Sequence, residues 1–96
     1  MSTPTRITHL VGHAPWQGEP GRTSEVFNPA TGEVTGALDL ADAATVDEVV
    51  AVASGAWQDW RHVSLARRVR ILFAFRQLLE ARKDEIALAI TAEHGK

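Results

Sequence analysis

Histidines are the first residues in this 96-residue chain whose chemistry could matter, because the chain has four of them. His9 and His13 are four positions apart, which places them on one face of a strand or a helix. No carboxylate or third histidine accompanies them at a ligand spacing. We therefore interpret both as surface or hairpin histidines, and we assign no metal site.

A second group contains the residue types of a hydrolytic triad, namely Asp59, His62 and Ser64. Ser64 also stands directly before an apolar helical pattern, where serine is a preferred helix N-cap. Capping explains this serine with fewer assumptions than catalysis does. We assign no catalytic residue here.

A basic stretch follows a tryptophan-containing helix pattern and superficially suggests a helix-turn-helix. It consists of Arg61, Arg67, Arg68, Arg70 and Arg76. Acidic residues balance it, and the formal net charge is −2, so nucleic acid is not expected as a partner. We interpret the arginines as a solvated or inter-domain face, and Trp57 and Trp60 as core residues.

Phosphate-binding loops are not found either. Gly18 and Gly21 are spaced G-x-x-G in a turn-rich stretch, which fits neither the dinucleotide fingerprint nor the P-loop. The chain has no cysteine, which excludes a thiol nucleophile within it. No cofactor-binding residue is assigned. No signal-peptide pattern or bilayer-length apolar run is present, so we expect a cytoplasmic location and no membrane partner.

The elements that would position these residues change character near residue 41. Residues 1–41 hold all four prolines and read as strands and turns: a strand at 7–11, a hairpin around Trp16, and strands at 25–28 and 33–41. Residues 42–96 read as a helical hairpin. Thr45 with Glu48 predicts a capping box, Ser64 an N-cap, Asp84 a cap after a kink, and Gly95 a C-terminal stop.

The second helix carries an apolar stripe that we expect to be buried. Its members are Leu65, Val69, Leu72, Phe75 and Leu79. Two helices and a few short strands cannot easily cover such faces. We therefore expect the chain to be the N-terminal piece of a larger protein, and to be molten or aggregated when isolated.

Residues 26–34, VFNPATGEV, form two strand-like ends around a rigid turn, in which Pro29 and Gly32 direct the chain. This segment resembles the Asn-Pro-x-Thr-Gly-Glu turn of the aldehyde dehydrogenase superfamily. The resemblance continues through the alanine-rich helix ending in tryptophans, the arginine-rich helix start and the ending Glu93-His94-Gly95-Lys96. It covers about residues 7 to 96. Within the superfamily it is strongest to the CoA-acylating methylmalonate-semialdehyde dehydrogenases.

This resemblance implies an α/β fold in which N-terminal β-hairpin strands precede a helical hairpin, as an incomplete part of one NAD-binding domain. It implies an enzyme of about five times this length that uses NAD as cofactor and coenzyme A as co-substrate. Methylmalonate semialdehyde would give propanoyl-CoA, and malonate semialdehyde acetyl-CoA, with loss of CO₂. A homo-tetramer and a role in valine catabolism are implied as well.

The family's catalytic cysteine has no counterpart here, so this chain alone is expected to be inactive. In some relatives, backbone oxygens just before the Asn-Pro bind a monovalent cation, which would correspond to Val26 and Phe27. We assign no metal site on that basis. Two alternatives remain open: a hydrolytic aldehyde dehydrogenase that gives a carboxylic acid, and a non-enzymatic helical interaction module.

Overall fold

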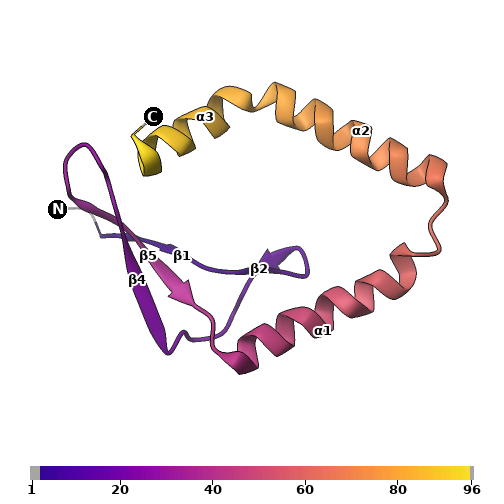
Figure 1. Ribbon diagram of the computed structural model, residues 1–96, viewed down its shortest axis with the longest axis horizontal. Helices are drawn as coiled ribbons and strands as arrows, with labels where there is room; N and C mark the ends of the chain where they lie inside the picture. Colours follow the sequence, from indigo (N-terminus) through magenta and orange to yellow (C-terminus); the bar gives the residue numbers. More distant parts are fainter. Residues whose placement is uncertain (1–2, 96) are drawn as a thin grey trace.

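The computed structural model describes residues 3–95 and contains strands followed by helices (Figure 1). The strands are β1 (Thr5–Ile7), β2 (Leu10–Val11), β3 (Ala14–Pro15), β4 (Arg22–Phe27) and β5 (Val34–Leu40). The helices are α1 (Ala43–Trp60), α2 (Leu65–Ala81) and α3 (Lys83–His94). This order confirms the predicted mixed α/β class.

Strand β5 is the centre of a sheet with the order β1-β5-β4. It pairs antiparallel with β4, as expected for a hairpin, and parallel with β1. The predicted strand at 7–11 is wrong in one respect, because the chain leaves β1 after Ile7 and starts β2 at Leu10. Strands β2 and β3 form the expected small hairpin, with Trp16 directly after it, where the Trp16 N–H donates to the His9 carbonyl at 2.8 Å.

Helix α1 begins earlier than predicted. The Asp42 side chain, not Thr45, is its N-cap, and it accepts from the Thr45 backbone N–H at 2.8 Å. The Thr45 hydroxyl also donates to the Asp42 carboxylate at 2.8 Å. The capping-box prediction was wrong because aspartate caps as well as threonine does, and Asp42 stands three residues nearer the strand. These hydrogen bonds lower the pKa of Asp42, and the one from the Thr45 backbone N–H has the largest effect.

The other helix ends follow the predictions more closely. Ser64 caps α2 by accepting from the Arg67 backbone N–H at 3.2 Å. Gly95 ends α3 in the left-handed conformation, with φ of 75°. Asp84 does not cap α3, which starts at Lys83 after Arg82 leaves helical geometry and has no side-chain cap. The break between α2 and α3, at Arg82, lies where the sequence predicted a kink.

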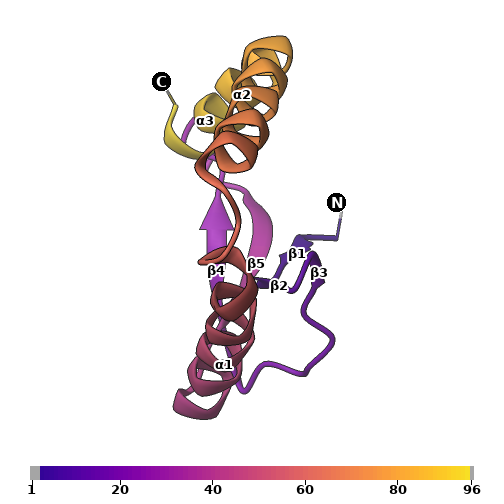
Figure 2. The same ribbon diagram turned by 90° about the vertical axis from the view of Figure 1, so that its right-hand side faces the viewer.

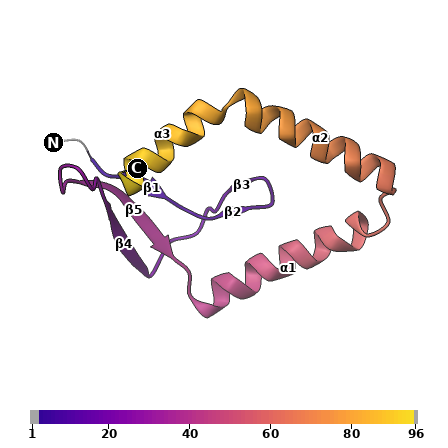
Figure 3. The same ribbon diagram turned by 45° about the horizontal axis from the view of Figure 1, so that its top comes forward.

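The helices trace an open arc and do not pack along one another, as Figures 1 and 3 show. The helical half is therefore three helices in an arc, a looser arrangement than the expected hairpin. Seen at right angles in Figure 2, the molecule is thin, and its extents are 49 × 35 × 17 Å. Its radius of gyration is 17.2 Å. A compact chain of this length would have about 12.5 Å.

Residues 3–95 contain no buried hydrophobic side chain. The accessible surface is 8083 Å², against about 5,400 Å² for a compact monomer of this mass. The predicted buried stripe of α2 is exposed, and Leu65 is the extreme at 77%. That expectation, and the core role of Trp57 and Trp60, are wrong within residues 3–95, because no described helix or strand packs along those faces.

None of the helices described is long and apolar enough to cross a membrane. The assignment of residues 1–41 and 42–96 to one incomplete NAD-binding domain remains a prediction.

Candidate functional site

The best-formed polar cluster lies on the sheet, where Arg6 of β1 meets Asp39 of β5. The Arg6 guanidinium donates to the Asp39 carboxylate from Nε at 3.0 Å and from an η nitrogen at 2.8 Å. The same η nitrogen donates to the Gly18 carbonyl at 2.9 Å. Asp39 is only 3% exposed, and its position follows from the parallel β1–β5 register. A buried carboxylate needs such a partner.

Electrostatics in this pair favour the charged forms. Hydrogen bonds from Arg6 hold the pKa of Asp39 below its ordinary value, and the same contact raises the pKa of Arg6. Both groups therefore keep their charge around neutral pH, so neither of them gains or loses a proton there. The pair fixes β1 and the 16–20 segment to the central strand, so its role is architectural.

Trp16 connects this segment to α1. Its indole Nε1 faces the Glu48 carboxylate at 3.4 Å, and its ring centroid is 5.1 Å from that of His9. The ring also covers Gly18 so closely that a Cβ at that position would overlap it. Gly18 therefore serves packing, not phosphate binding, which agrees with its weak G-x-x-G context.

The turn between β4 and β5 is held by its own backbone. The Asn28 carbonyl accepts from Gly32 N–H at 2.8 Å, and the Asn28 N–H donates to the Glu33 carbonyl at 2.8 Å. The Asn28 side chain accepts from Ala30 N–H at 2.9 Å. Gly32 has φ of 77°, a conformation that L side chains rarely adopt. The predicted rigid turn is present, and it presents no nucleophile or acid–base group.

The end of α3 returns to this turn, as Figures 1 and 3 show. A Cβ added at Gly95 would lie 3.3 Å from Pro29 Cγ. Two landmarks of the sequence, the Asn-Pro turn and the glycine that ends α3, are thus neighbours in space. Lys96, the last residue of that ending, lies outside the described residues.

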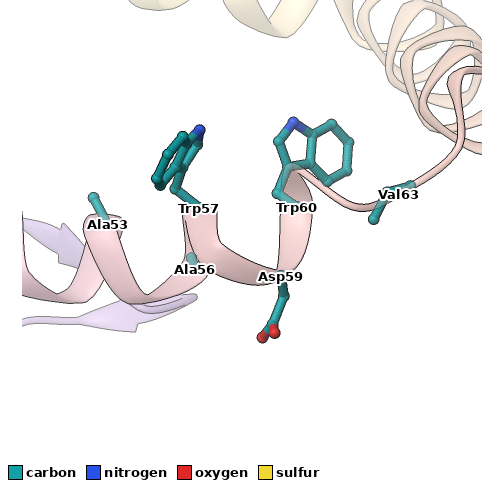
Figure 4. A pocket seen from close by; sticks show the side chains of 6 residues that line it. All are labelled: Ala53, Ala56, Trp57, Asp59, Trp60 and Val63. Carbon is teal, nitrogen blue, oxygen red and sulfur yellow. The ribbon is translucent and has the colours of Figure 1, made fainter.

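An open apolar groove of about 570 Å³ lies on the C-terminal half of α1 (Figure 4). Trp57 and Trp60 project to the same side, whereas Asp59 projects to the opposite side. The other lining residues are Ala53, Ala56 and Val63. Such a groove suits an apolar surface, but it lacks the converging polar donors that a dinucleotide pyrophosphate requires. This groove by itself therefore does not offer a site for the NAD pyrophosphate.

The possible triad is not assembled. His62 Nε2 accepts from the Arg61 guanidinium at 3.2 Å, whereas Ser64 Oγ accepts from the Arg67 backbone N–H. Within residues 3–95, neither Asp59 nor Ser64 has a side-chain hydrogen bond to His62. Helix capping accounts for Ser64, as expected.

The histidine pair is also separated by the fold. His9, after β1, lies against Trp16 with the two rings tilted by 56°, and His13 lies in the β2–β3 turn with φ of 75°. Among the residues described, no three histidine, cysteine or acidic side chains gather as metal ligands would.

Near the Asn-Pro turn, the Val26 carbonyl accepts from the Thr35 hydroxyl at 3.3 Å.

Sequence reasoning missed Arg6 and Asp39, which are 33 positions apart. The available signal was Asp39 itself, a carboxylate within the otherwise apolar strand sequence Ala37-Leu38-Asp39-Leu40. A charge at such a position implies a buried partner, but the partner's identity depends on strand pairing.

A family model described as "Aldehyde dehydrogenase family" matches residues 16–96. Curated relatives include malonate-semialdehyde dehydrogenases from Pseudomonas aeruginosa, 41% identical over 76 residues, and from Oceanobacillus iheyensis, 35% identical over 96 residues. These matches cover 79% and 100% of this chain. The chain spans 15% and 20% of the length of these relatives.

Solved structures give the same picture. The methylmalonate-semialdehyde dehydrogenase of Oceanimonas doudoroffii is 41% identical with a TM-score of 0.89, over 94% of this chain and 18% of that one. A Sinorhizobium meliloti 1021 protein assigned as a methylmalonate-semialdehyde dehydrogenase, solved with NAD, is 35% identical with a TM-score of 0.92. It is matched over 98% of this chain and 19% of its own.

Proposed function

The chain belongs to the aldehyde dehydrogenase family, and from this premise we propose that it forms part of the cofactor domain of an NAD-dependent, CoA-acylating semialdehyde dehydrogenase. The proposed enzyme oxidises methylmalonate semialdehyde to propanoyl-CoA and malonate semialdehyde to acetyl-CoA. Each reaction consumes NAD and coenzyme A and releases NADH and CO₂. The substrates are small-molecule aldehydes.

One observation carries this proposal: this chain is similar, in sequence and in backbone, to proteins named malonate- or methylmalonate-semialdehyde dehydrogenase. A TM-score of 0.89 at 41% identity means that the strands, the turn and all three helices follow the same path. Relatives named for malonate semialdehyde and structures named for methylmalonate semialdehyde support the same pair of substrates. The neighbour solved with NAD supports the cofactor.

The contribution of this chain to such an enzyme is structural. It contains no cysteine for nucleophilic attack on the aldehyde, and its groove on α1 is lined mainly by apolar side chains. What it supplies is a sheet fixed by the Arg6–Asp39 pair and helices with exposed apolar faces. We propose that these faces support the cofactor domain of the whole enzyme.

The test is an assay of the gene's natural product, combined with its intact mass. NADH formation is followed at a fixed concentration of methylmalonate semialdehyde, with and without coenzyme A. The proposal predicts a mass about five times that of this chain, and NADH only when coenzyme A is present. Propanoyl-CoA and CO₂ should appear in equal amounts with NADH.

NADH formed equally well without coenzyme A, with a free acid as product, would replace the CoA-acylating proposal by a hydrolytic aldehyde dehydrogenase. A natural mass of 10.4 kDa without NADH formation would contradict both. That result would favour the second candidate, a non-enzymatic helical interaction module, which the exposed apolar faces of α1 and α2 would suit.

A tetrameric assembly, a place in valine catabolism and a cytoplasmic location accompany this proposal as predictions. The mass measurement made under native conditions would test the first of them.

A further inference from the structure

Arg68, in the first turns of α2, reaches back to the end of α1. Its Nε donates to the Val63 carbonyl at 3.0 Å. One of its η nitrogens donates to the carbonyls of Trp60 at 3.1 Å and Arg61 at 2.8 Å. One guanidinium thus binds three successive parts of the α1–α2 connection.

The surroundings of Arg68 differ from those of its neighbours. Between residues 51 and 95, only Val63 and Arg68 are half-buried, and all the other residues are exposed. The Arg68 guanidinium carbon also lies 5.6 Å from the centre of the Trp60 ring, a cation–π distance. Arg67 and Arg70, on the same helix, are exposed.

The chemistry of a helix end explains why an arginine occupies this position. The last carbonyls of a helix lack intrahelical partners and carry the negative end of the helix dipole. A guanidinium offers a planar fork of donors, which a lysine ammonium does not. Arg68 is therefore a C-terminal cap of α1 that is supplied by the next helix.

We propose that Arg68 is a conformational lock that fixes the angle between α1 and α2. The two helices do not pack along one another, so the connection at 61–64 carries their relative orientation. The angle between the helices sets the position of the Trp57–Trp60 groove of α1 relative to the hollow on α2 at Val69, Leu72 and Phe73.

Amide hydrogen exchange in the protein as the cell makes it tests this proposal. In the Arg68→Gln variant, the amides of Arg61, His62 and Val63, which close the end of α1, should exchange faster. The amides within 47–56 and 70–80 should keep their wild-type rates. Arg70→Ala is the matched control, and it should leave the 61–63 amides unchanged.

Arg68→Lys separates the donor fork from the charge. It retains the cation near the carbonyls of Trp60, Arg61 and Val63 but cannot bind all three, so the 61–63 amides should still exchange faster than in the wild type. Wild-type exchange at 61–63 in Arg68→Gln would overturn the proposal. So would an increase spread evenly over all helices, or full protection of the corner by lysine.

Discussion

The strand half and the helical half of this chain are held in opposite ways. In the strand half, residues far apart in sequence fix one another, as Arg6 and Asp39 do across the sheet. In the helical half, order comes from local caps such as Asp42 and Ser64, and the apolar faces have no partner. The comparison teaches that regular helices can be fully specified locally while their packing depends on surfaces beyond them.

The largest effect is expected at the Arg6–Asp39 ion pair, in which the Asp39 carboxylate is buried and the Arg6 side chain is half exposed. Asp39→Asn removes the negative charge that neutralises the Arg6 guanidinium and leaves that cation without its counter-charge. We expect β5 amides to exchange at least about tenfold faster, as when a hydrogen bond to a charged group is lost. The readout is hydrogen exchange in the natural protein. Asp47→Asn, at an exposed position of α1, is the control. If it accelerated the exchange of the β5 amides as much as Asp39→Asn does, the proposed difference between the strand half and the helical half would be contradicted.

Acid should selectively weaken the strand half. The pKa of Asp39 is lowered in the folded protein, so its stabilising contribution is present above the unfolded pKa of about 3.9. It is lost as the pH falls through the lower folded value. Protection of β5 should therefore drop in that acidic range, and the drop should be absent in Asp39→Asn. Loss of protection near neutral pH would contradict this assignment.

A smaller effect is expected at the β4–β5 turn. Gly32→Val places a β-branched residue at a positive φ, which costs about 1–2 kcal/mol of folding free energy. The measurement is thermal unfolding of the natural protein together with its relative rates on the two semialdehydes. We expect lower thermal stability with unchanged substrate preference.

Gly55→Ala is the matched control in the other half. Outside the backbone of its own helix and its chain neighbours, no described atom would lie within 4 Å of a Cβ at Gly55. Alanine should therefore stabilise α1 by roughly 1 kcal/mol. Altered substrate preference at normal stability in Gly32→Val would show that the turn has a role beyond folding.

The smallest effect is expected at the α2 cap. Ser64→Ala removes the acceptor for the Arg67 backbone N–H and should cost about 1 kcal/mol of helix stability. Circular dichroism during denaturant titration measures it. Ser54→Ala, within α1, should be neutral or slightly stabilising. A catalytic role for Ser64 would instead abolish activity with no change in the titration.

The sequence was most informative where a residue acts on its own neighbours. Ser64, Gly95 and the turn through Pro29 and Gly32 were predicted because caps and turns depend on adjacent backbone. Thr45 and Asp84 were assigned wrongly as caps, because several nearby side chains could accept from the same free amides. The choice between them depends on where the preceding strand or helix ends.

Long-range pairs were not predictable in the same way. The Arg6–Asp39 contact depends on β1 lying parallel to β5, and Arg68 reaches its carbonyls only because the corner bends as it does. Trp57 and Trp60 were read as core residues from their apolar face, but within this chain that face is open. Periodicity identifies a face that needs cover, and it does not say which segment covers it.

Calorimetry of the isolated 96-residue chain tests the central claim most directly, namely that the helical half needs an apolar surface from outside this chain. We predict no cooperative thermal transition and strong binding of a hydrophobic dye, because the faces of α1 and α2 are uncovered. A single sharp transition whose calorimetric and van't Hoff enthalpies agree would contradict the account. It would mean that these helices close on the sheet by themselves.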